Sequence, residues 1–252
     1  MRMDCIASLA GLTLLIRPSG WNCTTKTFTN PMSQVEIFES DRAAGYNQFT
    51  DTWIPNYRYF LDQLPRILRD VPNKTLLAVG CGTGNEIERF VNAPETWNIT
   101  GVDPSPEMLK QARDKFQSLN NVTLIDGVIT AIGTEKQFGA ATLLLVLHFL
   151  EETEKLKLLK AIAERLAAGG LFVMFDITGE GDSFAENVKI LERLWPAGVD
   201  TQQAESRIYR IRHELHHISE ETLINLFEEA GFHKPVRFFQ SAVYMGWLAR
   251  KK

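Results

Sequence analysis

The sequence contains few cysteines, and their spacing excludes two kinds of structural site. Its 252 residues include 3 cysteines, Cys5, Cys23 and Cys81, which lie far apart and form no CxxC pair. A structural zinc site or a disulfide framework needs closely spaced or numerous cysteines, so we expect neither. This usage is typical of a reducing compartment, and the sequence therefore predicts a cytoplasmic protein.

An excess of positive charge is also lacking. The chain has 27 Lys and Arg residues against 31 Asp and Glu residues, which gives a net charge of −4. A protein that neutralises many phosphates needs the opposite balance, so the composition disfavours nucleic acid as a partner without excluding a small basic patch. We therefore expect a small-molecule substrate, bound by a monomer or a homodimer.

No apolar run is long enough to cross a membrane. Residues 5–16 are largely apolar, but a transmembrane helix needs roughly 20 such residues. Asp4 interrupts the basic start of an export signal, and no clear small-x-small cleavage motif follows. A coherent amphipathic pattern begins only after Met32. We expect residues 1–31 to be a disordered extension or a start-site artefact outside the fold, with a genuine export signal as the alternative.

The rest of the sequence alternates short apolar runs with amphipathic segments. This alternation predicts an α/β fold, a Rossmann-like, seven-stranded, mostly parallel, doubly wound sheet in one domain over 32–252. Two closing runs joined by a short turn predict an antiparallel last strand. The pattern loosens at about 178–218, where we expect an inserted cover. The expected strands are 75–79, 98–102, 121–125, 140–146, 171–177, 236–239 and 243–249, and the main amphipathic helices are 55–68, 85–91 and 152–168.

A glycine-rich loop follows the first expected strand directly. It reads Val79-Gly80-Cys81-Gly82-Thr83-Gly84, with the spacing GxGxG. Glycines let the backbone turn tightly and approach a ligand, and the amides that open the next helix face whatever is bound. The dinucleotide spacing GxGxxG would need a glycine where Asn85 stands, so a dehydrogenase is the weakest interpretation.

An aspartate ends the second expected strand. Asp103 lies nineteen residues after Gly84, and in a doubly wound sheet it faces the same crevice as the glycine loop. Its carboxylate can accept two hydrogen bonds from a ribose diol. The alternative is a turn or helix-capping aspartate before Pro104.

These residues carry a family resemblance. The stretch LLAVGCGTGNEIERF…ITGVDPSPEMLKQAR resembles the first two motifs of class I S-adenosylmethionine (SAM)-dependent methyltransferases. The likeness continues through LLLVLHFLEETEKLKLLKAIAERLAAGG and ends with the hairpin FFQSAVYMGWLARK, so it covers roughly residues 45–250. It implies the class I methyltransferase fold, SAM as cofactor, and an enzyme that moves a methyl group from SAM to an unidentified small-molecule acceptor.

The resemblance also assigns a cofactor site, from the methionine end of SAM to its adenine, and places no metal there. The implied residues are Gly80, Cys81, Gly82 and Gly84 for the methionine part, Asp103 for the ribose, Pro104, Met108, Gly127 and Val128 for the adenine, and Leu145 and His148 near the sulfonium.

Some candidate residues have two interpretations each. His148 could act as a general base on an acceptor, or it could only shape the pocket wall. Tyr57 could lay its ring over the sulfonium, or it could be a packing residue. Arg207, Arg210 and Arg212 could receive an acidic acceptor or an extra carboxylate on the cofactor, or form a solvated surface.

The sequence departs from the family pattern at three acidic positions. Ala78, Val128 and Gly139 stand where many members of the family carry a carboxylate, while Asp126 lies one position from a usual adenine contact. These losses favour a second hypothesis, a non-catalytic protein that keeps the SAM fold for binding.

A third hypothesis comes from another part of the resemblance. The stretch VLHFLEETEKLKLL and the final FFQ…GWLA hairpin are similar to carboxy-SAM synthases of tRNA modification. That chemistry also uses a pocket of the SAM fold, and the ligand that the protein carries would separate the two enzymes.

Overall fold

The computed structural model of the protein describes residues 37, 38 and 40–252. The prediction for residues 1–31 lies outside this part. In the part of the chain that the structure describes, the strands form a single seven-stranded sheet. They are β1 (Thr75–Val79), β2 (Asn98–Asp103), β3 (Val122–Asp126), β4 (Phe138–Leu144), β5 (Leu166–Ile177), β6 (Val236–Ser241) and β7 (Tyr244–Arg250).

The sheet confirms the predicted fold class. Its order is β3-β2-β1-β4-β5-β7-β6, in which β1 to β5 are parallel and β7 runs antiparallel to both β5 and β6. Every residue of β4 is buried because helices cover both faces of a parallel sheet. The order reverses direction between β1 and β4, which is where doubly wound sheets open a crevice for ligands.

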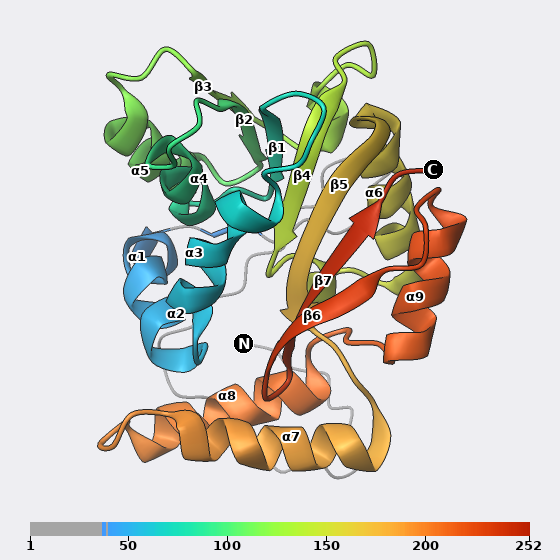
Figure 1. Ribbon diagram of the computed structural model, residues 1–252. Coiled ribbons are helices and arrows are strands. Elements are labelled where there is room, and N and C mark those ends of the chain that lie inside the picture. The colour runs from blue at the N-terminus through green and yellow to red at the C-terminus, as the bar shows by residue number, and fades with distance from the viewer. Residues whose placement is uncertain (1–36, 39) are drawn as a thin grey trace, which may run out of the picture.

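Helices pack on both faces of the sheet and across its carboxyl edge (Figure 1). The helices are α1 (Ser40–Ala44), α2 (Tyr46–Trp53), α3 (Tyr57–Ile67), α4 (Asn85–Val91), α5 (Pro106–Phe116), α6 (Glu152–Arg165), α7 (Gly181–Leu194), α8 (Thr201–His213) and α9 (Glu220–Glu229), with short 3-10 turns η1 (Ile129–Ala131) and η2 (Leu147–Phe149).

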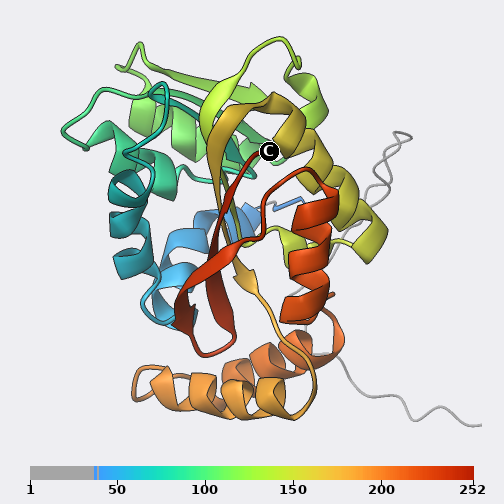
Figure 2. The ribbon, with the colours of Figure 1, turned by 45° about the vertical axis from the view of Figure 1, so that its right-hand side comes forward.

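The central strands divide their side chains between two apolar cores. Leu76 of β1 packs in the core shared with α3, α4 and α5, while its neighbour Leu77 packs in the core shared with α6 and α9. This follows from the period of two along a strand. Figure 2 shows α6 and α9 together on one face of the sheet. Side chains that could bind a polar ligand therefore lie at the ends of the strands rather than on the faces of the sheet.

One predicted boundary is wrong. The sequence predicts a helix over 152–168 that stops at Gly169-Gly170, but α6 ends at Arg165 and β5 begins at Leu166. Leu166 pairs with Phe138, after which the register shifts. Gly169, with φ +73°, lies in this irregular start of the strand rather than at a helix end.

The segment expected to be a cover, about 178–218, contains α7 and α8. These helices lie beyond the carboxyl ends of β4 and β5, opposite α1 and α2 (Figures 1 and 2). Ile208 and Ile211 of α8 are buried and belong to the same core as α3. Within the described residues, no helix combines the length and apolar character that crossing a membrane requires.

Candidate functional site

Two adjoining pockets lie at the carboxyl edge of the sheet. We name the first the glycine-loop pocket, because Gly80 and Gly82 line it together with Asp103 at the end of β2. We name the second the arginine pocket, because Arg42, Arg207 and Arg210 line it. The residues that the sequence predicted for the cofactor lie mainly in the first pocket.

The glycine loop is shaped by the absence of side chains. Gly80 has φ +64°, and a Cβ there would lie 2.5 Å from Cγ2 of Val146. Gly82 has φ +51°, and a Cβ there would lie 3.1 Å from Cε of Met108. The backbone amide of Gly80 donates to the carbonyl oxygen of Val102 at 2.8 Å, which ties the loop to the end of β2. The loop thus presents bare backbone to the pocket.

The side chain of Asp103 ties the glycine loop to the end of β2. Its side chain is buried, and it accepts hydrogen bonds of 2.8 Å from the amides of Gly82 and Ser105. Burial raises the pKa of Asp103, although these amide bonds oppose the shift and the nearby Asp126 adds to it. Each carboxylate oxygen has a further lone pair, so the two oxygens can also receive a pair of hydroxyl groups.

Most of the predicted cofactor residues line the same pocket. The residues that the structure brings together there are Gly80, Gly82, Asp103, Pro104, Met108, Gly127, Val128 and Leu145.

Three predicted residues do not line either pocket. Tyr57 is buried and its ring lies 5.5 Å from that of Phe175, so it has the packing environment that was the alternative. Cys81 is buried in the core, and Gly84 precedes α4 in a left-handed conformation with φ +78°. A cofactor role for these three remains a prediction without support from the pocket.

The missing carboxylate at Gly139 has a structural explanation. Gly139 lies at the start of β4, at the opposite end of the strand from the pocket residue Leu144. A Cβ at Gly139 would lie 2.2 Å from the carbonyl oxygen of Asn73, so no side chain fits there. The absence of an acid at this position therefore leaves the pocket unaffected.

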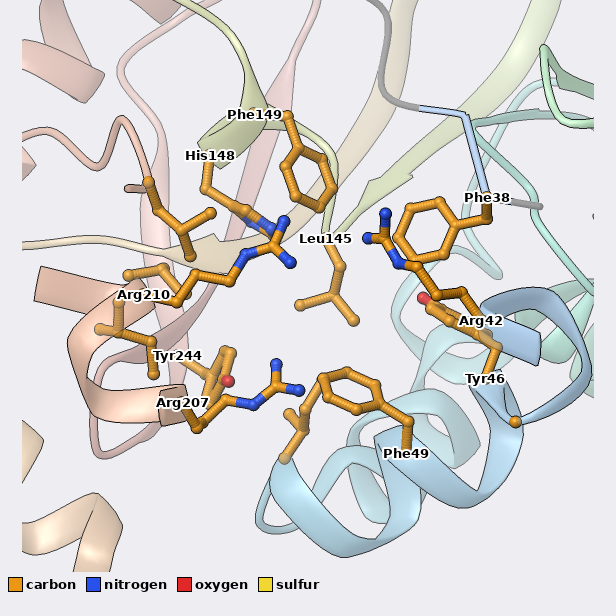
Figure 3. A pocket seen from close by; sticks show the side chains of 15 residues that line it. Phe38, Arg42, Tyr46, Phe49, Leu145, His148, Phe149, Arg207, Arg210 and Tyr244 are labelled. Atoms are coloured by element: carbon orange, nitrogen blue, oxygen red, sulfur yellow. The ribbon is translucent and has the colours of Figure 1, made fainter. Parts of the chain in front are cut away.

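The arginine pocket has a strongly basic lining. Arg42 comes from α1, while Arg207 and Arg210 come from α8 (Figure 3). The guanidinium of Arg207 lies 3.9 Å from the ring centroid of Phe49, and burial lowers its pKa to about 10. It therefore stays protonated at neutral pH. No Asp or Glu is found among the described residues that line this pocket.

The two pockets share a wall of apolar and aromatic side chains. Phe38, Tyr46, Leu145 and Phe149 line both of them. Leu145 has φ +60°, a left-handed conformation that is unfavourable for a branched side chain, and its amide donates to the carbonyl oxygen of Phe175 at 2.8 Å. Such strain at the junction of two pockets is typical of a functional position.

The predicted base, His148, has a buried acidic partner. Nδ1 of His148 lies 2.5 Å from Oδ1 of Asp176, and Oδ2 of Asp176 accepts the amide of Leu147 at 2.7 Å. His148 lines the arginine pocket. Sequence analysis missed Asp176, although a single aspartate within the apolar run of β5 was the available signal.

This pairing predicts the tautomer of His148. Because Nδ1 points at a carboxylate, neutral His148 should carry its proton on Nδ1 and leave Nε2 unprotonated. In the D176N variant we expect this preference to weaken, measured by ¹⁵N chemical shifts of the imidazole. His217, whose Nδ1 lies 2.8 Å from the carbonyl oxygen of Gly179, is the internal control and should not change. An Nε2–H tautomer in the wild type would contradict the assignment.

No metal site is formed by the described residues. Groups of three or more His, Cys, Asp or Glu side chains placed to hold an ion are absent from residues 37, 38 and 40–252. His213, His216 and His217 have separate partners, the ring of Tyr209, the carboxylate of Glu151 and the Gly179 carbonyl oxygen.

Comparisons with known proteins agree with this geometry. Residues 76–170 match a family described as "Methyltransferase domain". Carboxy-S-adenosyl-L-methionine synthase 1 of Yersinia pseudotuberculosis serotype IB (strain PB1/+) is 24% identical over 238 residues, which are 89% of this chain and 98% of the relative. Trans-aconitate 2-methyltransferase of Rhodopseudomonas palustris (strain BisA53) is 32% identical over 96 residues, 38% of this chain and 37% of the relative.

The fold is similar to that of a solved methyltransferase. Human N-acetylserotonin methyltransferase in complex with SAM superposes with a TM-score of 0.58 at 19% identity, over 83% of this chain. The chain spans 55% of the length of that protein. At this identity the likeness supports the architecture, and the chemistry has to be argued from the two pockets.

Proposed function

We propose that this chain, which belongs to the class I SAM-dependent methyltransferases, transfers the methyl group of SAM to a small acidic acceptor bound in the arginine pocket. The observation that supports this best is the wall shared by the two pockets. A nucleoside in the glycine-loop pocket would end at Leu145 and Tyr46, which also face the arginine pocket. The reacting groups would meet at that junction.

The residues of the glycine-loop pocket suit SAM. Asp103 has lone pairs left for a ribose diol, and the cradle at Gly80 and Gly82 would be filled by any side chain. Met108 and Val128 supply apolar walls for an adenine ring. When bound, SAM supplies a methyl group on a sulfonium that is already activated for transfer.

The main task of the protein is then to position the acceptor, because the methyl donor is already activated. Methyl transfer is an in-line displacement, so its rate depends on holding the acceptor atom in line with the methyl group. Arg207 and Arg210 would bind an acidic group of the acceptor by charge-assisted hydrogen bonds. His148, oriented by Asp176, would accept a proton from the acceptor if one has to leave.

A second enzyme function is supported by the same arginines. A carboxylate attached to the cofactor's sulfonium would also project from the shared wall toward Arg207. The Yersinia pseudotuberculosis relative is named for the synthesis of such a carboxy-SAM. The cofactor carried by the purified protein, identified by mass spectrometry, distinguishes a carboxy-SAM enzyme from a methyltransferase.

Binding to the wild type and to the R207M variant tests the arginine pocket. Methionine keeps an apolar stem against Phe49 but removes the charge. If the pocket receives an acidic group next to the sulfonium, R207M should weaken carboxy-SAM binding roughly tenfold and leave SAM binding within about twofold, measured by calorimetry.

The R212M variant is the matched control, because Arg212 lies on the same helix but is exposed to solvent. Equal loss of both ligands in R207M would contradict a carboxylate subsite and would indicate a packing role for Arg207. If the wild type binds neither SAM, S-adenosylhomocysteine nor carboxy-SAM, the proposed function fails and the non-catalytic hypothesis is favoured.

A further inference from the structure

Guanidinium groups of the arginine pocket lie over aromatic rings. Cζ of Arg42 lies 4.3 Å from the ring centroid of Phe38, and Cζ of Arg207 lies 3.9 Å from the ring centroid of Phe49. Arginine stacks on aromatic faces at such distances, which leaves the N–H donors at the rim of the flat group. Figure 3 shows the guanidinium of Arg207 directed into the pocket. The pocket therefore combines charged donors with apolar ring faces.

Arg207 has donors left for a ligand. Its guanidinium carbon also lies 5.6 Å from the ring centroid of Trp53, and none of the described residues accepts a hydrogen bond from it. A charged donor in apolar surroundings is stabilised by an anion that accepts its hydrogen bonds. Arg207 therefore marks the position of an acidic group. The aliphatic side chains that line the same pocket are Ile54, Leu145, Ile177, Ile211 and Leu215.

The stacking of Arg207 on Phe49 limits the shape of the acid that fits. A carboxylate that accepts two hydrogen bonds from one guanidinium lies in the plane of that guanidinium. In an aromatic acid the carboxylate is conjugated with the ring, so the whole ligand can continue in this plane beside Phe49. A saturated acid bends away at its tetrahedral α-carbon. The pocket therefore favours a flat acid.

Further aromatic rings line the rest of the pocket. The ring of Tyr46 stacks on Phe49 with centroids 6.3 Å apart, and the ring of Phe149 meets Phe38 edge to face at 6.1 Å. Such walls give a flat ring offset-stacked and edge-to-face contacts that a saturated ring cannot make. Because Phe38, Tyr46 and Phe149 also belong to the shared wall, an aromatic body bound at Arg207 would extend toward the cofactor.

His148 indicates the reacting group of such an acid. In Figure 3 His148 and Arg207 reach the pocket from opposite sides. Since Nδ1 of His148 faces Asp176 at 2.5 Å, Nε2 can accept a proton. A phenolic hydroxyl has a pKa of roughly 10 and is a much better proton donor than an aliphatic alcohol. The proton would pass to Nε2, the oxygen would take the methyl group, and the electron pair of the methyl–sulfur bond would stay on sulfur.

We propose that the acceptor is an aromatic carboxylic acid with a hydroxyl group on its ring, bound with the carboxylate at Arg207 and the hydroxyl at His148. This rests on the proposed function, since it names the chemical class of the acceptor for the same site. An aliphatic acid would need only the charge of Arg207. The aromatic walls and the base on the opposite side are explained by a flat ring that carries a second, ionisable group.

Calorimetry on protein saturated with S-adenosylhomocysteine tests this class without turnover. 4-Hydroxybenzoate and trans-4-hydroxycyclohexanecarboxylate carry the same two groups and differ in the flatness of the ring. We expect the wild type to bind the aromatic acid roughly tenfold more tightly. 4-Hydroxybenzamide, which keeps the ring but lacks the charge, should bind at least roughly tenfold more weakly than 4-hydroxybenzoate.

The F49L variant tests the ring that stacks on Arg207. Leucine keeps an apolar side chain at this half-buried position but removes the flat face, so the preference for the aromatic acid should fall roughly threefold or more. The matched control is Y209L, because Tyr209 lies on the same helix as Arg207, is 59% exposed and lines neither pocket. This variant should keep the preference of the wild type.

The outcomes separate this inference from the function on which it rests. Equal affinity of the wild type for the two acids, or an unchanged preference in F49L, would overturn the aromatic class and leave an acidic acceptor in place. Binding of neither acid by the loaded protein would overturn the acidic acceptor as well. Failure to bind S-adenosylhomocysteine would instead overturn the proposed function. If F49L does not fold, the wild-type preference alone decides.

Discussion

Replacing Asp103 with alanine should weaken binding of SAM and of 5′-methylthioadenosine by roughly 100-fold or more. Two hydrogen bonds from a ribose diol to a charged, buried carboxylate contribute roughly 1.5–3 kcal/mol each. The substitution also frees the amides of Gly82 and Ser105, which Asp103 holds at 2.8 Å. Calorimetry of both ligands measures the loss. Because 5′-methylthioadenosine keeps the ribose, it should lose affinity here as SAM does.

A neighbouring aspartate provides the control. Asp126 lies beside Asp103 in the register of β2 and β3 but is exposed, so D126A should change nucleoside affinity by less than about threefold. Acidification gives an independent check. The ionised form of Asp103 receives the diol, and its pKa is raised above 3.8, so affinity should fall at a higher pH than an ordinary aspartate would give. Unchanged affinity in D103A would contradict the ribose assignment.

The G80A variant should lose both stability and cofactor affinity. An alanine at φ +64° costs about 1–2 kcal/mol, and its Cβ would lie 2.5 Å from Cγ2 of Val146. Valine is branched at Cβ and cannot turn away freely, so overpacking adds about 1–3 kcal/mol. We expect the free energy of unfolding to fall by about 2–5 kcal/mol in denaturant titrations. SAM affinity should drop by roughly tenfold or more as the loop shifts.

The double variant G80A/V146A separates the two causes. Removing the Val146 methyl groups should relieve the clash and recover part of the stability relative to G80A, while the backbone strain remains. Stability and affinity in G80A equal to those of the wild type would show that the loop tolerates a side chain. That result would contradict the proposal that SAM lies against the bare backbone of the glycine loop.

Local sequence patterns predicted the cofactor side of the site. The glycine loop and Asp103 follow two strands that the apolar runs mark clearly, and in a parallel sheet the carboxyl ends of such strands meet at one edge. The strand order alone was therefore enough to predict that the loop and Asp103 meet. The structure shows this contact as a 2.8 Å hydrogen bond from the Gly82 amide to Asp103. The start of β5 was misplaced because Leu166 pairs with Phe138, a long-range contact that helical periodicity does not report.

Other parts of the site depend on contacts between distant segments. Arg42 and Arg207 are 165 positions apart, and only the packing of α1 and α8 over the same sheet edge brings them to one pocket. Asp176 pairs with His148 across two adjacent strand ends, at a separation of 28 residues.

By itself the sequence determined the doubly wound sheet, the GxGxG loop and the carboxylate of Asp103, because apolar period, glycine spacing and strand order are local properties of the chain. The tertiary structure decided which charged side chains lose water and which ones face each other. It placed the guanidinium groups beside the shared wall and gave His148 its buried acid. These outcomes depend on desolvation and on long-range packing, which no single segment of the sequence encodes.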